Sequence, residues 1–434
     1  MDSPSKSGGV QNPDRNAQDL VYPRHSRYGL TADCPLNNFG DVTSYYQSPS
    51  DNDGLWTNIY LASQSYRYAV TRDPEALRNA LESLNAIQFL QDVTGLPGYP
   101  ARSFAKYGDT GTSYNPSRGQ HTWFNSTTFP GWVYLSDTSS DEIAGNEYGL
   151  SVFHKYAASS NQERTTSANL VANVTKWIIH NGYYLISPLN ERTTWGVWAP
   201  EYLNGNASWY DQRGINSLQI LSWLVTSANL DPAEASLYEE HFATLFGHHG
   251  YGVNMINQKI SVPNDENYSD DEIAWLPFAT WALATAPSLS HSPSSSLSSS
   301  HLLSLSPSHL SSLSYWYAIN RSMAFAVTEK SSLWNVIYLS ALPDPTADAE
   351  LYDTLMNDAI WCLQTWPIEQ IDWPVRNSQR HDYIPRELIV DNDKIDSFSV
   401  FRYDEQSFFR FRTFLAGNQN SPPPPRNPFC RAIQ

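Results

Sequence analysis

The sequence has few cysteines and no long apolar run. Its 434 residues include three cysteines, Cys34, Cys362 and Cys430, which lie far apart in the chain. None belongs to a CxxC motif or pairs with histidine at zinc-ligand spacing, so neither a disulfide framework nor a structural zinc site is expected. No stretch approaches the ~18 to 20 apolar residues of a membrane span, and the polar start MDSPSKSGG lacks a signal-peptide core. We therefore expect a soluble chain without a membrane span.

Basic residues are also scarce. The chain has 27 Lys and Arg against 44 Asp and Glu, a formal net charge of −17, and no basic cluster. This balance argues against nucleic acid or an anionic membrane as the main partner. There is no phosphate loop, GxSxG elbow or dinucleotide fingerprint, and DNDG at 51–54 lacks the later ligands of a calcium loop. The sequence thus predicts no cofactor and no metal, and a neutral or sugar-like ligand suits it best.

Aromatic residues, in contrast, are plentiful. They make up 13% of the chain, and many of the 15 Trp stand in polar surroundings such as TTWGVWAPEYL and ASWYDQRG. Roughly half should pack in the core, since Trp is mostly buried and needs one partner for its N–H. The others are candidate ligand platforms, and we assign Trp56, Trp195 and Trp198 to substrate binding.

Apolar periodicity predicts repeated helical hairpins. Apolar residues recur at helical spacing from Leu55, and Asp73 followed by Pro74 marks the N-cap and first turn of a second helix. The same apolar spacing recurs in helix pairs at 139–181 and 211–249, and in helices that begin at 268, 331 and 346. Longer segments rich in Gly, Pro and aromatics, which can carry short strands, lie between them. This pattern predicts an all-α fold, a toroid or solenoid of helical hairpins.

The chain divides into three expected parts. Residues 1–47 form an irregular lead-in, 48–415 the helical toroid, and 416–434 a Pro-rich tail. The toroid is interrupted at 287–314 by a segment of mostly Ser, Leu, His and Pro, which buries too little apolar surface to order itself. That segment is either a disordered insertion or translated non-coding sequence, and the ring could lack its last hairpins.

A six-residue phrase occurs twice, as SSDEIA at 139–144 and SDDEIA at 269–274. Ser139 with Glu142, and Ser269 with Glu272, fit a capping box that opens a helix, and Ser50 with Asp53 fits the same scheme. If these helices line a toroid, their first turns meet at one mouth. The acids gathered there would be Asp53, Asp141, Glu142, Asp271 and Glu272.

Convergent carboxylates beside Trp and Tyr are typical of a sugar-processing cleft. Glycoside hydrolysis usually uses two carboxyl groups, and we take Asp53, Asp141 and Glu142 as the catalytic candidates. An acid in a first turn is favoured in its ionised form and suits a base. The general acid is better sought beside aromatic rings, where Asp53, Glu201 and Asp211 lie.

Three basic residues in the connectors complete the candidate site. Arg102 and Arg213 could clamp a substrate carboxylate or form structural ion pairs with the many acids. If they face the cleft, the substrate could be a uronic acid, and a lyase with His121 or a Tyr as base becomes possible.

Five segments carry a resemblance to a known family. They are 51–76, 96–104, 137–150, 195–204 and 211–221, and together they resemble the six-hairpin glycosidase-like superfamily of (α/α) toroids. The resemblance implies a carbohydrate-active enzyme, a hydrolase or polysaccharide lyase, with its site at the ring mouth. It also implies a carbohydrate substrate and, from that substrate, a secreted or extracytoplasmic location. A glycoside hydrolase is our first hypothesis, a uronic-acid lyase the second, and an inactive or truncated carbohydrate-binding ring the third.

Overall fold

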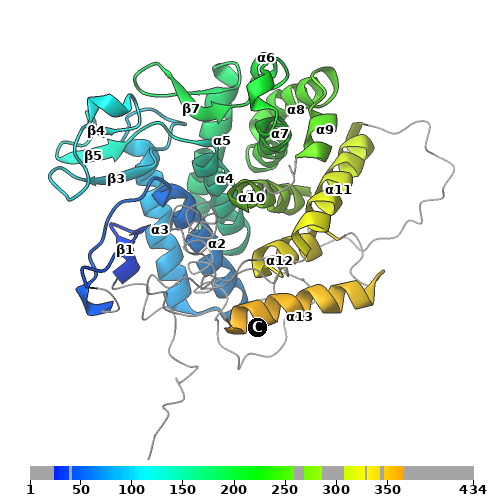
Figure 1. The fold of residues 1–434 in the computed structure, drawn as a ribbon, viewed down its shortest axis with the longest axis horizontal. Helices are drawn as coiled ribbons and strands as arrows, with labels where there is room; N and C mark the ends of the chain where they lie inside the picture. Colours follow the sequence, from blue (N-terminus) through cyan, green and yellow to red (C-terminus); the bar gives the residue numbers. More distant parts are fainter. Residues whose placement is uncertain are drawn as a thin grey trace, which may run out of the picture.

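The chain is mostly helical. A computed structural model describes residues 24–38, 42–258, 268–285, 307–327, 330–342 and 347–365. Helices dominate these ranges and strands are short (Figure 1). The all-α prediction is therefore confirmed for this part of the chain.

The helices follow one another in pairs. The pairs are α2 (Asp53–Thr71) with α3 (Pro74–Asp92), α4 (Ser140–Tyr156) with α5 (Asn161–His180), α7 (Gln212–Leu230) with α8 (Ala235–Ala243), and α12 (Ser332–Ala341) with α13 (Ala349–Thr365). Beside them lie α6 (Pro200–Leu203), α9 (Tyr251–Asn254), α10 (Tyr268–Thr285) and α11 (Pro307–Ala326). The predicted hairpins are present, and Asp73 caps α3 as expected, because its carboxylate accepts the N–H of Glu75 at 2.9 Å.

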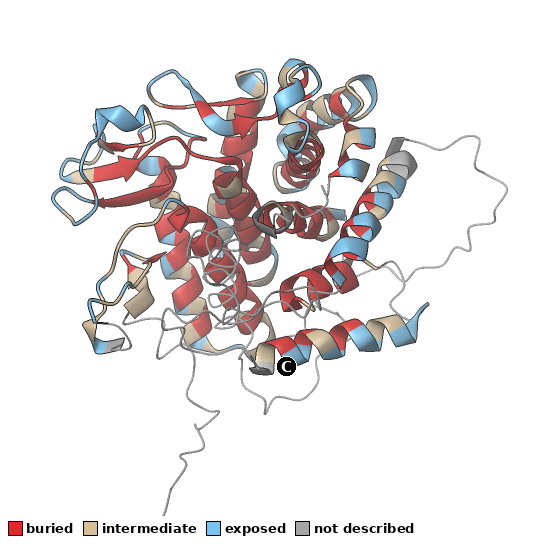
Figure 2. Ribbon diagram, in the orientation of Figure 1, coloured by how far each residue is buried: buried red, intermediate tan, exposed pale blue. Residues whose placement is uncertain are grey.

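An inner layer of helices carries the core. In α2 every residue from Asp53 to Arg67 is buried, and in α4 every residue from Glu142 to Phe153 (Figure 2). Helix α10 packs on α4, α7 and α12, while α3 and α5 cover α2 and α4 from outside. A helix buried on all sides needs neighbours all round, which explains why α2 and α4 lack the amphipathic pattern of α3.

The inner helices run in the same direction. Gln212 at the start of α7 bonds Asp270 near the start of α10, and Ser222 farther along α7 bonds the Pro277 carbonyl at 2.8 Å. At the far ends of α4 and α10, Lys155 donates to the Leu283 carbonyl at 3.0 Å. The first turns of these helices therefore lie at one end of the molecule. Closure into a ring stays a prediction.

Two glycines of α4 allow it to approach α2 closely. A Cβ atom added at Gly145 would lie 2.7 Å from Leu55 Cα, and one at Gly149 would lie 2.5 Å from the carbonyl oxygen of Asn58. Both contacts are with backbone, which cannot move aside as a side chain can. The spacing between the two helices thus depends on the absence of side chains at these positions.

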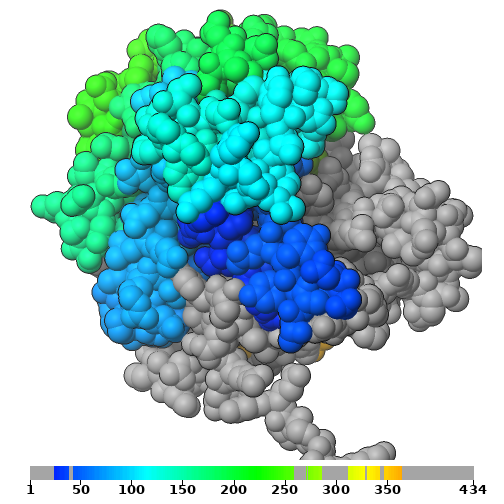
Figure 3. Space-filling view, turned by 90° about the vertical axis from the view of Figure 1, so that its left-hand side faces the viewer, coloured from blue at the N-terminus to red at the C-terminus, as the bar shows by residue number. Residues whose placement is uncertain are grey.

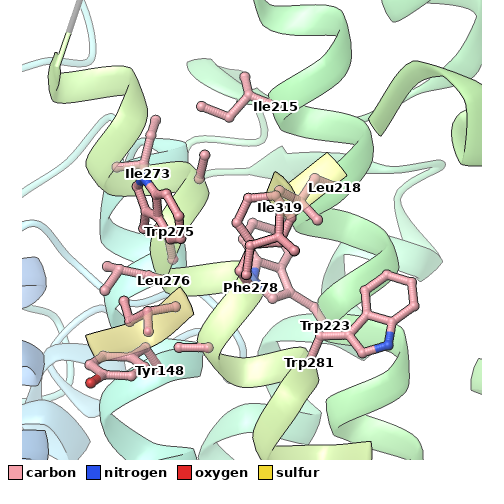
Figure 4. Packing of buried hydrophobic residues seen from close by; sticks show 14 of the residues in the cluster. Tyr148, Ile215, Leu218, Trp223, Ile273, Trp275, Leu276, Phe278, Trp281 and Ile319 are labelled. Carbon is pink, nitrogen blue, oxygen red and sulfur yellow. The ribbon is translucent and has the colours of Figure 1, made fainter. Parts of the chain in front are cut away.

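Large aromatic side chains fill the centre. Trp275 and Phe278 of α10 lie beside Trp223 of α7 (Figure 4), and the rings of Trp275 and Phe278 are 5.6 Å apart between centroids. Trp198, which we predicted to bind substrate, is fully buried, packs on Trp223 and donates to Gln219 Oε1 at 2.9 Å. In this structure it presents no surface to a ligand.

Short strands occupy the connectors, as the sequence allowed. The connector between α3 and α4 holds an antiparallel sheet of β3 (Ser103–Lys106), β5 (Trp132–Leu135) and β4 (Trp123–Asn125), in that order. The connector after α5 holds the pair β6 (Tyr184–Ile186) and β7 (Arg192–Val197), and β1 (Ser26–Arg27) pairs with β2 (Leu30–Thr31) near the start. The connector between α3 and α4 lies directly above the segment from residue 24 to α2 in the view of Figure 3.

Two local expectations are changed. Helix α11 begins at Pro307, so 307–314 is helical rather than part of an irregular insertion, since proline is well suited to a first helical turn. The rest of that segment, 287–306, and the tail at 416–434 lie outside the described residues. The lead-in is less irregular than expected, because 24–47 contains β1, β2 and a short 3₁₀ helix at Val42–Ser44.

The predicted capping box at Ser139 and Glu142 is wrong. Ser139 precedes α4 but its side chain makes no cap hydrogen bond. Glu142 turns toward α2 instead of reaching back, because Gly54 leaves room for its carboxylate there. A complete capping box forms at Ser160 and Glu163, at the start of α5, which the sequence analysis did not identify.

The contact of α4 with α2 yields a test of the packing. We expect Gly149→Ala to lower the free energy of unfolding by about 1 to 3 kcal/mol, because the methyl group must displace the backbone of α2. Chemical denaturation measures this change. Gly247→Ala is the matched control, since a Cβ there meets nothing within 4 Å. It should leave stability unchanged or raise it by up to about 1 kcal/mol, and equal losses in both variants would contradict the close approach.

Candidate active site at the start of α2 and α4

Asp53 is the first residue of α2 and has no exposed surface. Its Oδ2 accepts hydrogen bonds from Arg27 at 3.2 Å and from Ser103 Oγ at 2.6 Å, and its Oδ1 accepts one from Ser50 Oγ at 2.8 Å. Burial raises the pKa of Asp53, although the Arg27 charge and these hydrogen bonds act in the opposite direction. The predicted catalytic Asp53 is therefore enclosed between the N-terminal segment and β3.

Glu142 lies beside Asp53, on the first turn of α4. It has no exposed surface, and a Cβ atom on Gly54 would lie 2.0 Å from its Oε2. No hydrogen bond of normal geometry reaches either carboxylate oxygen among the described residues. Burial raises the pKa of Glu142 well above its usual range, and the Arg102 charge and the nearby Leu55 amide do not offset this effect. Our expectation that a first-turn acid is ionised is thus wrong for Glu142, because loss of water outweighs the helix dipole.

A histidine held between two aspartates forms the exposed side of the cluster. His121 Nε2 lies 3.2 Å from Asp51 Oδ1, and its Nδ1 lies 3.8 Å from Asp137 Oδ2. The side chains of His121 and Asp51 are 20% and 47% exposed, whereas that of Asp137 is 7% exposed. The hydrogen bond from His121 lowers the pKa of Asp51. The predicted His121 is therefore an accessible imidazole with carboxylates on both sides.

Asp137 is held in a strained conformation. Its φ is +59°, a left-handed value that costs a residue other than glycine about 1 to 3 kcal/mol. The carboxylate accepts hydrogen bonds from the backbone N–H of Thr194 at 2.7 Å and from the Thr194 hydroxyl at 2.9 Å. These bonds attach β7 to the start of α4 and fix the carboxylate that faces His121.

Arg102 positions the cluster from inside. Its Nε donates to the Asp137 carbonyl at 2.6 Å, and a guanidinium nitrogen donates to the Asp51 carbonyl at 3.1 Å and to Asn52 Oδ1 at 3.0 Å. The side chain is buried. We had left open a substrate clamp or an ion pair, and the structure shows a third arrangement, in which Arg102 joins the segments before α2 and α4.

Sequence reasoning did not select Asp51 and Asp137, and a usable signal existed. Asp51 stands just before α2, in DNDG, and Asp137 stands just before α4, in SDTSSDE. At the starts of α2 and α4 we had considered only acids inside the first helical turn. Residues just before two helices also come close together when the helices begin side by side, as α2 and α4 do.

Aromatic rings, among them exposed Trp195, gather where β7 and α6 meet. Trp195 follows Thr194 on β7, is 47% exposed, and its ring centroid lies 5.9 Å from that of Trp209. Tyr202 packs edge-on against Trp209 at 4.9 Å. Trp56, also predicted to bind substrate, is instead buried in α2. Trp195 is therefore the predicted aromatic that the fold leaves exposed, one residue along β7 from the Thr194 that bonds Asp137.

Other predicted site residues lie at the starts of α6, α7 and α10. Exposed Asp211 caps α7 by accepting the N–H of Gln212 at 3.0 Å, and Arg213 donates to the Leu203 carbonyl at 2.8 Å. Glu201 on α6 accepts the Tyr184 hydroxyl at 2.9 Å. Glu272 is buried on α10, and the side chain of Asp271 lies outside the described part. These residues share an end of the molecule with the cluster, and no direct contact joins them to His121 or Glu142 in the described ranges.

Other properties of the described residues bear on function. No helix among them is long and apolar enough to cross a bilayer, and no three His, Cys, Asp or Glu side chains there are placed to hold a metal ion. Comparisons with protein-family models, curated proteins and solved structures found no match to this chain. Function must therefore be argued from the site itself.

The cluster combines groups suited to proton transfer. Burial raises the pKa of Glu142 well above its usual range, whereas the hydrogen bond from His121 lowers that of Asp51. His121 lies between two carboxylates, and Asp141 is partly exposed on the same turn of α4 as Glu142. Groups with opposed protonation preferences at one place are what general acid–base chemistry requires.

The raised pKa of Glu142 predicts a pH-dependent stability. Between its unfolded and folded pKa values the folded chain binds more protons than the unfolded chain, so stability falls as pH rises from about 4.5. Glu142→Gln removes this effect. Its stability relative to the parent protein should increase with pH, by at most about 1.4 kcal/mol per pH unit.

Denaturant unfolding at a series of pH values measures this difference. The exposed Glu239→Gln variant is the control and should track the parent protein at every pH. A constant difference between Glu142→Gln and the parent across the range would show that Glu142 ionises in the folded protein as it does in the unfolded chain.

Proposed function

We propose that the protein is a carbohydrate-active enzyme that cleaves a glycosidic bond at the cluster where α2 and α4 begin. One observation carries the proposal: His121 lies between the carboxylates of Asp51 and Asp137, and buried Arg102 joins their two segments at the starts of α2 and α4. Exposed Trp195, one residue along β7 from the Thr194 that bonds Asp137, offers a flat apolar face of the kind on which sugar rings stack. The acidic chain suits a ligand without negative charge.

We further propose that the inner helices belong to an (α/α) toroid of the six-hairpin glycosidase-like type. Support comes from α4, α7 and α10, which run in one direction, and from α2, whose start contacts the start of α4. In such an arrangement the inner first turns gather at one mouth. The cluster would lie at that mouth, with the connectors after α3 and α5 as its rim.

Hydrolysis is the first candidate reaction. It needs one carboxyl group that gives a proton to the leaving oxygen and one that activates water or attacks the sugar. Asp141 suits the second role, because it is partly exposed and the α4 N-terminus favours its charge. Glu142 suits the first role, because burial raises its pKa well above the usual range of a carboxyl group. This role requires substrate binding to displace the first turn of α2, which covers the Glu142 carboxylate.

Substitutions at the exposed members of the cluster test the proposal. We expect Asp141→Asn and His121→Asn each to lower the rate of sugar release from an oligosaccharide panel by about 10² to 10⁴-fold, as loss of a proton-transfer group does. Reducing-end assays and circular dichroism measure activity and folding. Asp211→Asn, an exposed acid at the start of α7, should retain activity. Full activity in both cluster variants would overturn the site assignment.

Elimination on a uronic-acid polymer is the second candidate reaction. Its favouring observation is His121, which is partly exposed and held by Asp51, so that it can remove a proton from the sugar ring. Arg118 lies close enough to affect the pKa of Asp51 and is exposed, so a substrate carboxylate has a cation within the site. A lyase breaks the bond to the leaving sugar and creates a carbon–carbon double bond.

The two reactions differ in their products. If the protein is a lyase, uronic-acid polymers should yield products that absorb in the ultraviolet, and His121→Asn should abolish this absorbance with normal folding. Arg118→Ala should raise KM more than it lowers kcat. A hydrolase would instead release saturated reducing ends. Saccharide binding without any product would indicate the third hypothesis, an inactive carbohydrate-binding protein.

A further inference from the structure

A pocket outside the candidate active site lies between α3 and α5. It encloses about 400 Å³, within the range of sites that hold small molecules. One wall is the last turns of α3 with the turn at 95–97, and the other is the first half of α5. Residues 128–129 of the connector after α3 close one end. None of the residues that line the pocket belongs to the cluster around His121.

The lining combines neutral polar groups with apolar surface. Side-chain amides come from Gln88, Gln91, Asn169 and Asn173, and hydroxyls from Thr128 and Thr166. The Gln91 amide is already bonded within the protein, whereas the amides of Asn169 and Asn173 each offer donors and an acceptor to neighbouring hydroxyl groups of one ligand. A ligand rich in hydroxyl groups satisfies such a lining better than an apolar one does.

The remaining lining groups restrict the chemical class of the ligand further. Leu96 and Phe129 provide apolar surface, against which the C–H face of a sugar ring can pack. Asp92 is the charged residue of the lining, and no Lys or Arg lines the pocket. Asp92 can accept hydrogen bonds from hydroxyl groups, whereas it repels a ligand that carries a carboxylate or phosphate.

The walls of the pocket are fixed before any ligand arrives. Gln91 is 3% exposed, its Nε2 donates to the Leu170 carbonyl at 3.0 Å, and its Oε1 accepts the Gly98 N–H at 3.3 Å. Gly98 packs so tightly on α5 that a Cβ atom there would lie 2.4 Å from the Asn173 carbonyl oxygen. Phe129 packs edge-on against Phe89 of α3 at 5.0 Å. A preformed site loses less conformational freedom on binding.

We propose that this pocket binds a neutral saccharide unit at a position separate from the proposed active site. The inference rests on the volume, the amide-rich lining, the apolar patch and the single carboxylate, and it holds whether or not the cluster around His121 catalyses a reaction. In an enzyme that cleaves long glycans, a second site of this kind would retain the polymer between cleavage events.

Calorimetric titration and saturation-transfer NMR test the proposal with cellobiose, maltose, xylobiose and digalacturonic acid as probes. At least one of the three neutral disaccharides should bind saturably, and digalacturonic acid should bind this pocket at least tenfold more weakly. Asn169→Trp places a large side chain in the pocket from an exposed helix position and should weaken binding of the neutral probe at least tenfold. Gln162→Trp is the matched control, exposed on the same helix and outside the lining, and should bind normally.

Two further variants separate this site from the proposed active site and test the role of charge. Trp195→Ala and His121→Asn should leave unchanged the part of neutral-probe binding that Asn169→Trp removes, because both residues lie outside the pocket. Asp92→Asn should bring digalacturonic acid to within about threefold of the neutral probe once the repulsion is removed. Saturable binding that survives Asn169→Trp but is lost in Trp195→Ala, or no saturable binding of any neutral probe, would overturn the proposal.

Discussion

The close contact of α4 with α2 determines where every group of the candidate site lies. Gly145 and Gly149 allow the two helix backbones to approach, and Gly54 leaves space for the Glu142 carboxylate. A wider spacing would give Glu142 access to water and would separate Asp51 from the segment that carries Asp137. Arg102 then joins these segments through backbone carbonyls. The polar groups of the cluster are thus brought together by the packing of α2 and α4.

Burial rather than the helix dipole governs the protons of this site. The dipole of a helix N-terminus contributes at most about 2 kcal/mol, whereas placing a carboxylate in a dry interior costs several times more. Glu142 has no compensating hydrogen bond of normal geometry, so its protonated form is favoured. Asp51 receives a hydrogen bond from His121 and keeps more contact with water, so its ionised form is favoured. Two acids at the starts of neighbouring helices therefore have opposite tendencies.

Local sequence patterns predicted the elements well and the surroundings of the site less well. The helix periodicity and the Asp73–Pro74 start hold because they depend on neighbours in the chain. The capping box at Ser139 fails because Gly54, distant in sequence, offers Glu142 another place. Trp198 and Arg102 look like exposed binding residues in a polar stretch, yet tertiary contacts bury both. The pairing of His121 with Asp51 depends on the connector after α3, whose path the sequence does not specify.

Helix α4 carries a second buried acid, and comparison of the two indicates why Glu142 is the one placed for chemistry. Glu147 lies among α4, α5 and α7, accepts a hydrogen bond from Thr175 at 3.2 Å, and has a pKa raised well above its usual range by burial. It lies farther along α4 than any group of the cluster, enclosed by helices that form the core. Glu142 lies on the first turn, where displacement of a few residues of α2 would expose it. Both acids are buried, but only Glu142 lies where the proposed function could use it as a proton donor.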